Sequence, residues 1–167
     1  MMKKAIVFGM ILFFAGFGLK FFHIHYNAII MMAGLSVLFV TYALGALLKK
    51  SGINILVGFT ITMWLTFLLF TVKYFPHMTY VLYGAIALTV VVIFKELSNQ
   101  MDVQLILLGL CIFLSISLYF MPSDERYYLL NIKWNHEIEN DYISYDKYSW
   151  HLYNKEKIDL ALEVSEK

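Results

Sequence analysis

Acidic side chains are almost missing from the first 121 residues of this chain, which contain only Glu96 and Asp102. Neither carboxylate lies in the middle of a long apolar run, and no Lys or Arg does either. Ionisable groups inside a membrane mark proton relays, ion pathways and voltage sensors. A proton-driven pump or motor would therefore have no carboxylate to titrate, and we expect no dependence on the proton gradient through this chain.

Proline and cysteine are also scarce. The two prolines, Pro76 and Pro122, fall outside the middle of the apolar runs, so the sequence does not indicate the broken helices of secondary transporters. The single cysteine, Cys111, cannot form an intrachain disulfide. Because Cys111 lies in an apolar run, we expect a buried and chemically inert thiol.

Motifs for catalysis and for cofactor binding are missing as well. The chain has no G-x-S-x-G, H-E-x-x-H or P-loop pattern and no paired carboxylates. His23, His25 and His77 lie at the ends of apolar runs, but a metal site would also need a further ligand such as Cys, Asp or Glu nearby. We predict no catalytic residue, metal or cofactor, and no nucleic-acid partner, because no basic cluster lies away from the membrane edges.

Apolar residues, by contrast, dominate the chain. They make up 60% of it, against about 45–50% in soluble domains. Five runs approach or reach the roughly 17–25 residues that a membrane helix needs, and short connections favour antiparallel hairpins. The sequence predicts an all-α, polytopic membrane protein, with a transmembrane domain over 1–121 and a polar helical tail over 122–167. The five expected spans are 5–22, 27–48, 53–72, 78–94 and 103–121.

The first span has an alternative interpretation as a signal peptide. It has a basic start and an apolar core, but it lacks an A-x-A cleavage site, and Phe21 and Phe22 follow where small residues belong. We therefore expect it to remain as a membrane helix.

Lysine placement predicts the orientation of the chain. Positive residues are enriched in cytoplasmic loops, and five lysines fall on the N-terminal side of the predicted membrane, against three basic residues on the other. The two groups are Lys3, Lys4, Lys49, Lys50 and Lys95, and Lys20, Lys73 and Arg126. We expect a bacterial inner-membrane protein with a cytoplasmic N-terminus and a periplasmic tail, although one helix more or fewer would invert the tail.

Small and weakly polar residues recur at helical spacing within the first three spans. Helices in lipid associate through such residues, because small side chains let two backbones approach closely. We predict that they form helix-packing faces, and a polar substrate path is the alternative. The candidate residues are Gly9 and Gly16 with Ala5, then Gly34, Thr41 and Gly45, then Asn54, Gly58, Thr62 and Thr66.

A weak internal repeat marks the exits of the first and third spans. Leu19-Lys20-Phe21-Phe22-His23 and Val72-Lys73-Tyr74-Phe75-Pro76-His77 occupy equivalent places. The repeat favours two similar hairpins followed by a fifth helix. The alternative is that any helix exit carries a lysine and aromatic residues at the membrane surface.

The first hairpin resembles a known family through Lys20, His23, Ala28 and Gly34-Leu35. These residues match the transmembrane hairpin of GldL, the inner-membrane ring protein of the gliding and type IX secretion motor of Bacteroidota, and of its short relatives. The family's Trp-Pro-Gly is replaced here by residues 24–27. The proton-binding Glu of the motor members is also missing, because residues 36–39 read Ser-Val-Leu-Phe. The resemblance implies a membrane assembly without motor activity.

The tail resembles a single tetratricopeptide unit. Residues 142–153 carry apolar and aromatic side chains at helical spacing, residues 154–157 break the pattern, and a second helix follows from Ile158. One repeat cannot bury its own face, so this pair must pack on a neighbour, although an ordinary helical hairpin is the alternative. We expect its rings to divide between a small core and a contact with another protein chain: Tyr142, Tyr145, Tyr148, Trp150 and Tyr153.

Together these features favour a non-enzymatic membrane scaffold or accessory subunit. Its helices would assemble in the lipid, and its aromatic tail would dock a partner. Two alternatives stay open, a small transporter or channel component and a membrane signalling or defence effector with a sensing tail.

Overall fold

The structure is a computed structural model and describes residues 2–22, 24, 26–48, 54–75, 77–96, 103–134 and 142–166. These residues form eight helices and no strand. Five of the helices are long and apolar enough to cross a membrane, which confirms the expected all-α, multi-pass fold. They are α1 (Met2–Phe21), α2 (Asn27–Leu47), α3 (Ile55–Lys73), α4 (Met78–Glu96) and α5 (Val103–Phe120).

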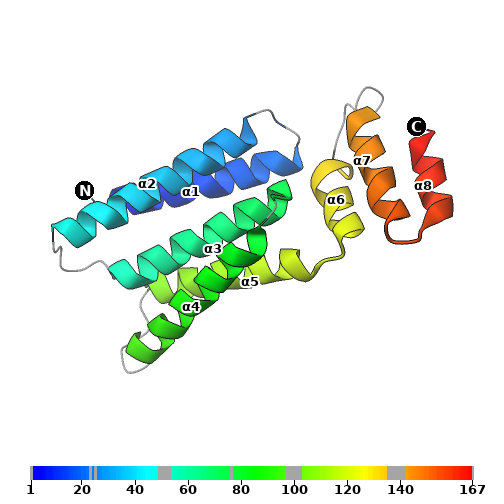
Figure 1. Cartoon of the computed structure of the whole chain (residues 1–167). Coiled ribbons are helices and arrows are strands. Elements are labelled where there is room, and N and C mark those ends of the chain that lie inside the picture. The colour runs from blue at the N-terminus through cyan, green and yellow to red at the C-terminus, as the bar shows by residue number, and fades with distance from the viewer. Residues whose placement is uncertain are drawn as a thin grey trace.

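Helix α3 is the centre of the membrane part and packs against α2, α4 and α5 (Figure 1). About 67% of its apolar window is buried, against 33% or less for the other four helices. Side chains tie it to its neighbours. The indole N–H of Trp64 donates to the hydroxyl of Thr89 in α4 at 2.8 Å, and the hydroxyl of Ser115 in α5 donates to the Trp64 carbonyl at 3.3 Å.

Helices α1 and α2 form an antiparallel hairpin that packs beside this centre (Figure 1). Glycines make the hairpin tight. A Cβ atom at Gly34 would lie 2.6 Å from the backbone nitrogen of Phe13 and 2.7 Å from the carbonyl oxygen of Gly9. The two backbones therefore touch where both helices lack a side chain, as small-residue packing in lipid requires.

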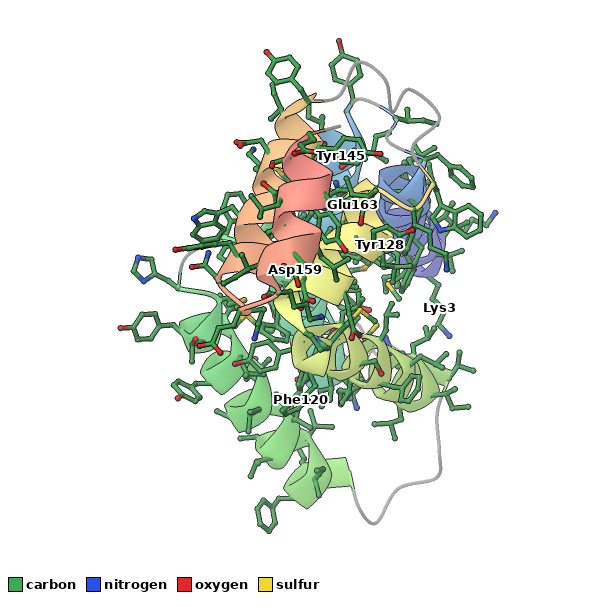
Figure 2. All side chains as sticks on the ribbon, turned by 90° about the vertical axis from the view of Figure 1, so that its right-hand side faces the viewer. Lys3, Phe120, Tyr128, Tyr145, Asp159 and Glu163 are labelled. Atoms are coloured by element: carbon green, nitrogen blue, oxygen red, sulfur yellow. The ribbon has the colours of Figure 1, made fainter. Side chains whose placement is uncertain are left out.

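Helix α4 contacts α3 but leans away from the rest of the bundle (Figure 2). Only 11% of its apolar window is buried within the chain. Large side chains such as Tyr80 and Phe94 are exposed, so this helix offers most of its surface to lipid or to another chain.

The tail consists of three short helices that lie together at one end of the bundle (Figure 1). They are α6 (Ser123–Asn131), α7 (Tyr142–Tyr153) and α8 (Ile158–Ser165). Pro122 precedes α6, and Asp124 and Glu125 lie in its first turn. Acidic side chains in this position stabilise a helix through their favourable interaction with the helix dipole. Helix α6 packs against α1 and α7, and α7 packs against α8, so the tail rests on the ends of the membrane helices.

Candidate functional site

Arg126, which is only 5% exposed, attaches the tail to two of the membrane helices. Its Nη1 donates to the carbonyl oxygen of Leu118 at 3.0 Å and contacts that of Tyr119 at 3.4 Å. These carbonyls belong to the last turn of α5, where backbone acceptors lack helical partners. The guanidinium carbon also lies 4.9 Å from the centre of the Tyr74 ring. One arginine of α6 thus joins the C-terminal ends of α3 and α5.

A cluster of aromatic rings lies beside this arginine. The Tyr127 ring lies 5.7 Å from Tyr74, 4.9 Å from His151 and 6.3 Å from Tyr148, measured between ring centres. Tyr74 itself caps α3 in the left-handed conformation, with φ at 54°, which turns the chain out of the helix. The cluster therefore joins α3 to α6 and α7 through aromatic contact.

An ion pair holds the start of α8 against α6. Lys157 Nζ lies 2.5 Å from Asp124 Oδ2, and the Asp124 side chain is 3% exposed while that of Lys157 is 44% exposed. Burial acts to raise the pKa of Asp124, but hydrogen bonds from Lys157 and from the backbone outweigh it, so this pKa lies below its ordinary value. The buried member of the pair is therefore charged and depends on an exposed lysine.

The two lysines of the internal repeat lie at the same place in the fold. Lys20 donates to the side-chain oxygen of Asn131 in α6. Lys73 donates to the side-chain oxygen of Asn27 at 2.8 Å, which joins the end of α3 to the start of α2. The sequence suggested only that these lysines mark helix exits. Nothing in the local pattern predicted the asparagines that accept from them.

The junction pocket, as we name it, opens between these lysines and the tail. Its volume is about 940 Å³. It is walled by the end of α3, by Lys20 and Asn131 and by both helices of the tail hairpin. The lining residues are Lys20, Val72, Lys73, Tyr74, Tyr127, Asn131, Asp146, Lys147, Ser149, Trp150, His151, Tyr153, Ile158, Ala161, Leu162 and Ser165.

The five rings expected to divide between core and partner lie in two environments. Tyr145 is 8% exposed and packs with Tyr127 and Ile132, and Tyr148 packs partly buried against the same cluster. The other three are largely exposed, with Tyr142 at 75%, Trp150 at 62% and Tyr153 at 64%. Trp150 and Tyr153 stand at the junction pocket.

The residues expected to form packing faces lie at helix contacts to different degrees. Gly9 and Gly34 face each other, Gly16 lies against Asn27 and Met31, and Gly58 lies against the Tyr42 ring. Gly45 lies beside the end of the Met2 side chain. Asn54 caps the start of α3 by accepting from the Val57 N–H at 3.2 Å.

The threonines among these residues form hydrogen bonds within their own helices. Thr41, Thr62 and Thr66 donate to the carbonyl oxygens four residues earlier, those of Val37, Gly58 and Thr62. Thr41 and Thr62 are buried, and Thr66 is partly buried. Their hydroxyls are thus satisfied by the backbone, and these bonds give no support to a polar path lined by them.

Histidines and the cysteine occupy separate places. Cys111 is buried in α5, and His77 is exposed and stacks on Tyr80. His23 and His25 lie outside the described residues. Within the described ranges, no group of three His, Cys, Asp or Glu side chains is placed to hold a metal ion.

Comparisons of the chain with protein-family models, with curated proteins and with solved structures each found no match. The resemblance of the first hairpin to GldL-related proteins therefore stays a prediction. The junction pocket and the exposed face of the tail are the two features of the described structure that bear on function.

Proposed function

We propose that this chain is a non-enzymatic scaffold or accessory subunit of a bacterial inner membrane that docks another protein chain through its tail hairpin. The supporting observation is the exposure of large rings on a tail that is fixed to the membrane helices. Tyr142, Trp150 and Tyr153 are each more than 60% exposed. Tyr and Trp dominate binding hot spots because they bring contact area at low entropic cost.

The form of the hairpin supports the same proposal. Helices α7 and α8 pack through Leu152 and Ala161, which are 2% and 7% exposed. On one side the hairpin leans on α6, and Leu160, which does not line the junction pocket, is more than half exposed. A tetratricopeptide-like unit with one covered face and one open face suits a partner that continues the stack.

The first hairpin supports assembly within the membrane. In our proposal α1 and α2 form a unit like the GldL-related hairpin, and the surface of α4 contacts further subunits. The chain would serve as a structural member of such an assembly, since residues 36–39 carry no acidic side chain. Native mass spectrometry of the protein released from lipid would test this part, and a purely monomeric species would contradict it.

A pull-down from native membranes tests the docking face. The triple variant Tyr142→Ala, Trp150→Ala and Tyr153→Ala should reduce the recovery of specific partners at least about tenfold, because each hot-spot ring contributes roughly 1–2 kcal/mol or more. Trp134→Ala is the matched control, because Trp134 is a tail tryptophan that is 46% exposed and lies outside the hairpin. Equal recovery with the triple variant and the control would refute tail docking.

The proposed orientation has its own test. We propose a cytoplasmic N-terminus and a periplasmic tail, from the lysine bias and the odd number of spans. Cysteines introduced at Ser51 and Ser123, in a Cys111→Ala background, should react from opposite sides of the membrane. Labelling of both positions from the same side would contradict this topology.

A second candidate function is a membrane effector with a sensing tail. The observation that favours it is the junction pocket, because a ligand bound there would touch both the membrane helices and the hairpin. A water-soluble ligand that changes the exposure of Trp150 in the purified protein would favour this candidate, and a Trp150 unchanged by such ligands would favour the scaffold.

A further inference from the structure

We propose that the junction pocket binds the phosphate-bearing headgroup of an anionic membrane lipid. The inference does not depend on the proposed docking of a protein partner.

The junction pocket lies at the level of the lipid headgroups. Helix α3 has 19 residues, which at about 1.5 Å per residue span about 28 Å, close to the roughly 30 Å hydrocarbon core of a bilayer. Its last residue, Lys73, therefore lies at the headgroup level, as does Lys20 near the end of α1. Both line the junction pocket, so the pocket opens where phosphate groups are concentrated.

Basic side chains outnumber acidic ones in the lining of the pocket. Three lysines line the pocket, Lys20, Lys73 and Lys147, and one carboxylate, Asp146, faces them. The remaining titratable imidazole, His151, has a pKa lowered by burial and by Arg126, so it stays neutral at neutral pH. The lining is therefore cationic overall. The bond from Lys73 goes to the neutral amide of Asn27, which leaves its positive charge available to an anion.

The apolar walls of the pocket favour a lipid over a free anion. Val72, Trp150, Ile158 and Leu162 line the same space as the lysines, and a small hydrated anion would gain nothing from them. A lipid would place its phosphate near the ammonium groups and its glycerol and upper acyl carbons against these side chains. The volume of about 940 Å³ falls within the range of about 300–1,000 Å³ for small-molecule pockets.

The test uses the full-length protein in a neutral detergent and measures binding through tryptophan fluorescence. Four probes separate the possible sources of an anion: dioctanoyl phosphatidylglycerol, dioctanoyl phosphatidylcholine, inorganic phosphate and a hexaglutamate peptide. We expect the phosphatidylglycerol to bind at least about tenfold more tightly than the other three. Equal binding of phosphatidylcholine would overturn the proposal. Tighter binding of free phosphate or of the peptide would also overturn it, in favour of an anion site or a protein-binding site.

Charge-removing variants assign the site. Lys73→Gln with Lys147→Gln should weaken phosphatidylglycerol binding about tenfold or more, because each lysine near an anionic headgroup contributes about one kcal/mol. Lys73→Arg with Lys147→Arg should restore most of the affinity, which separates loss of charge from loss of folding. Lys155→Gln is the matched control, because Lys155 is an exposed lysine of the α7–α8 turn that does not line the pocket. Unchanged affinity in the double glutamine variant would overturn the assignment.

Discussion

The guanidinium group of Arg126 lies over the ring of Tyr74, with 4.9 Å between the guanidinium carbon and the ring centre. The contact joins the first helix of the tail to the residue that ends α3. Because Arg126 also donates to α5 carbonyls, it fixes the position of the tail against two membrane helices at once.

Replacing Arg126 should loosen the tail without unfolding the membrane part. We expect Arg126→Met to lose roughly 1.5–3 kcal/mol of docking stability, since a charged hydrogen bond and a cation–π contact both disappear. Hydrogen–deuterium exchange should report faster exchange in α6 and α7 and no change in α3. Arg126→Lys should recover only part of the protection, because lysine lacks the planar fork.

Tyr74→Phe is the matched control for this contact. The Tyr74 hydroxyl is buried and forms no hydrogen bond of ordinary geometry among the described residues, although the neighbouring Arg126 opposes the rise in its pKa that burial causes. Removing it should therefore change the docking stability little, because the loss of the interaction with Arg126 is offset by the loss of a buried polar group. If Tyr74→Phe loosens the tail as much as Arg126→Met, the hydroxyl and not the ring carries the contact.

The Asp124–Lys157 pair should respond unequally to the loss of its two members. Asp124 is buried and Lys157 is largely exposed, so Lys157→Met leaves a buried carboxylate without its cation, while Asp124→Asn leaves a lysine that reaches water. We expect the lysine variant to destabilise the tail more. Thermal unfolding of the purified variants checks this order. The reverse order would mean that Lys157 stabilises the tail more through the packing of its aliphatic chain, which methionine keeps, than through its charge.

The same pair predicts a pH window. The pKa of Asp124 is lowered in the folded tail, so its contribution is present above the ordinary pKa of about 4 and is lost as pH falls through the lowered value. The pKa of Lys157 is raised, chiefly by the hydrogen bond to Asp124, so its contribution is present below about pH 10.4 and is lost as pH rises through the raised value. The pair should stabilise the tail between these limits. Lys157→Met should remove the alkaline limit and change the acid limit, where the backbone hydrogen bonds to Asp124 remain.

Local sequence patterns predicted the helices well and the junction poorly. Apolar runs bounded by lysines predict the five membrane-spanning helices, because the length and hydropathy of a segment depend only on its own residues. The Lys20–Asn131 bond joins residues 111 positions apart, and no periodicity encodes such a partner. The sequence indicates Arg126 only as a topology charge, although it is buried in the junction. The pocket could not be predicted, because it exists only once these distant elements meet.

Alanine substitutions at Gly58 and Gly34 should differ in whether a second substitution can restore stability. A Cβ at Gly58 would lie 2.1 Å from the Tyr42 ring, so Gly58→Ala should cost roughly 1–3 kcal/mol by overpacking. Tyr42→Ala should relieve this cost, because the clash is with a side chain. At Gly34 the clash is with the backbone of α1, so Gly34→Ala should separate α1 from α2, and a side-chain change should not restore the packing.

These effects are measured as the free energy of unfolding of the variants, in detergent micelles that contain increasing amounts of sodium dodecyl sulfate. Gly18→Ala and Gly109→Ala are the controls, because nothing lies within 4 Å of a Cβ at either position. Loss of stability in the controls equal to that in Gly34→Ala would show that helix flexibility, and not close approach, explains the glycines.

His151 should make the docking of the tail weaker in acid. Its imidazole lies 4.9 Å from the Tyr127 ring and 5.5 Å from the Tyr74 ring. Burial and then Arg126 lower its pKa, and Asp124 opposes them. An undocked tail would bind the proton more tightly, at the ordinary pKa of about 6.5, so the docked state loses stability as pH falls below that value. Only one proton is involved, so the slope is at most about 1.4 kcal/mol per pH unit.

Exchange protection of α7, corrected for the intrinsic pH dependence of exchange, tests the role of His151. Protection in the native protein should fall between about pH 7 and about pH 5, and His151→Gln should remove most of this change, because glutamine keeps a polar side chain that does not titrate. Asp124 titrates below this range, so it does not compete for the effect. A native tail whose protection does not change with pH would show that protonated His151 is tolerated in the docked tail. A His151→Gln tail with the same slope as the native protein would show that the fall in protection belongs to another group at the junction.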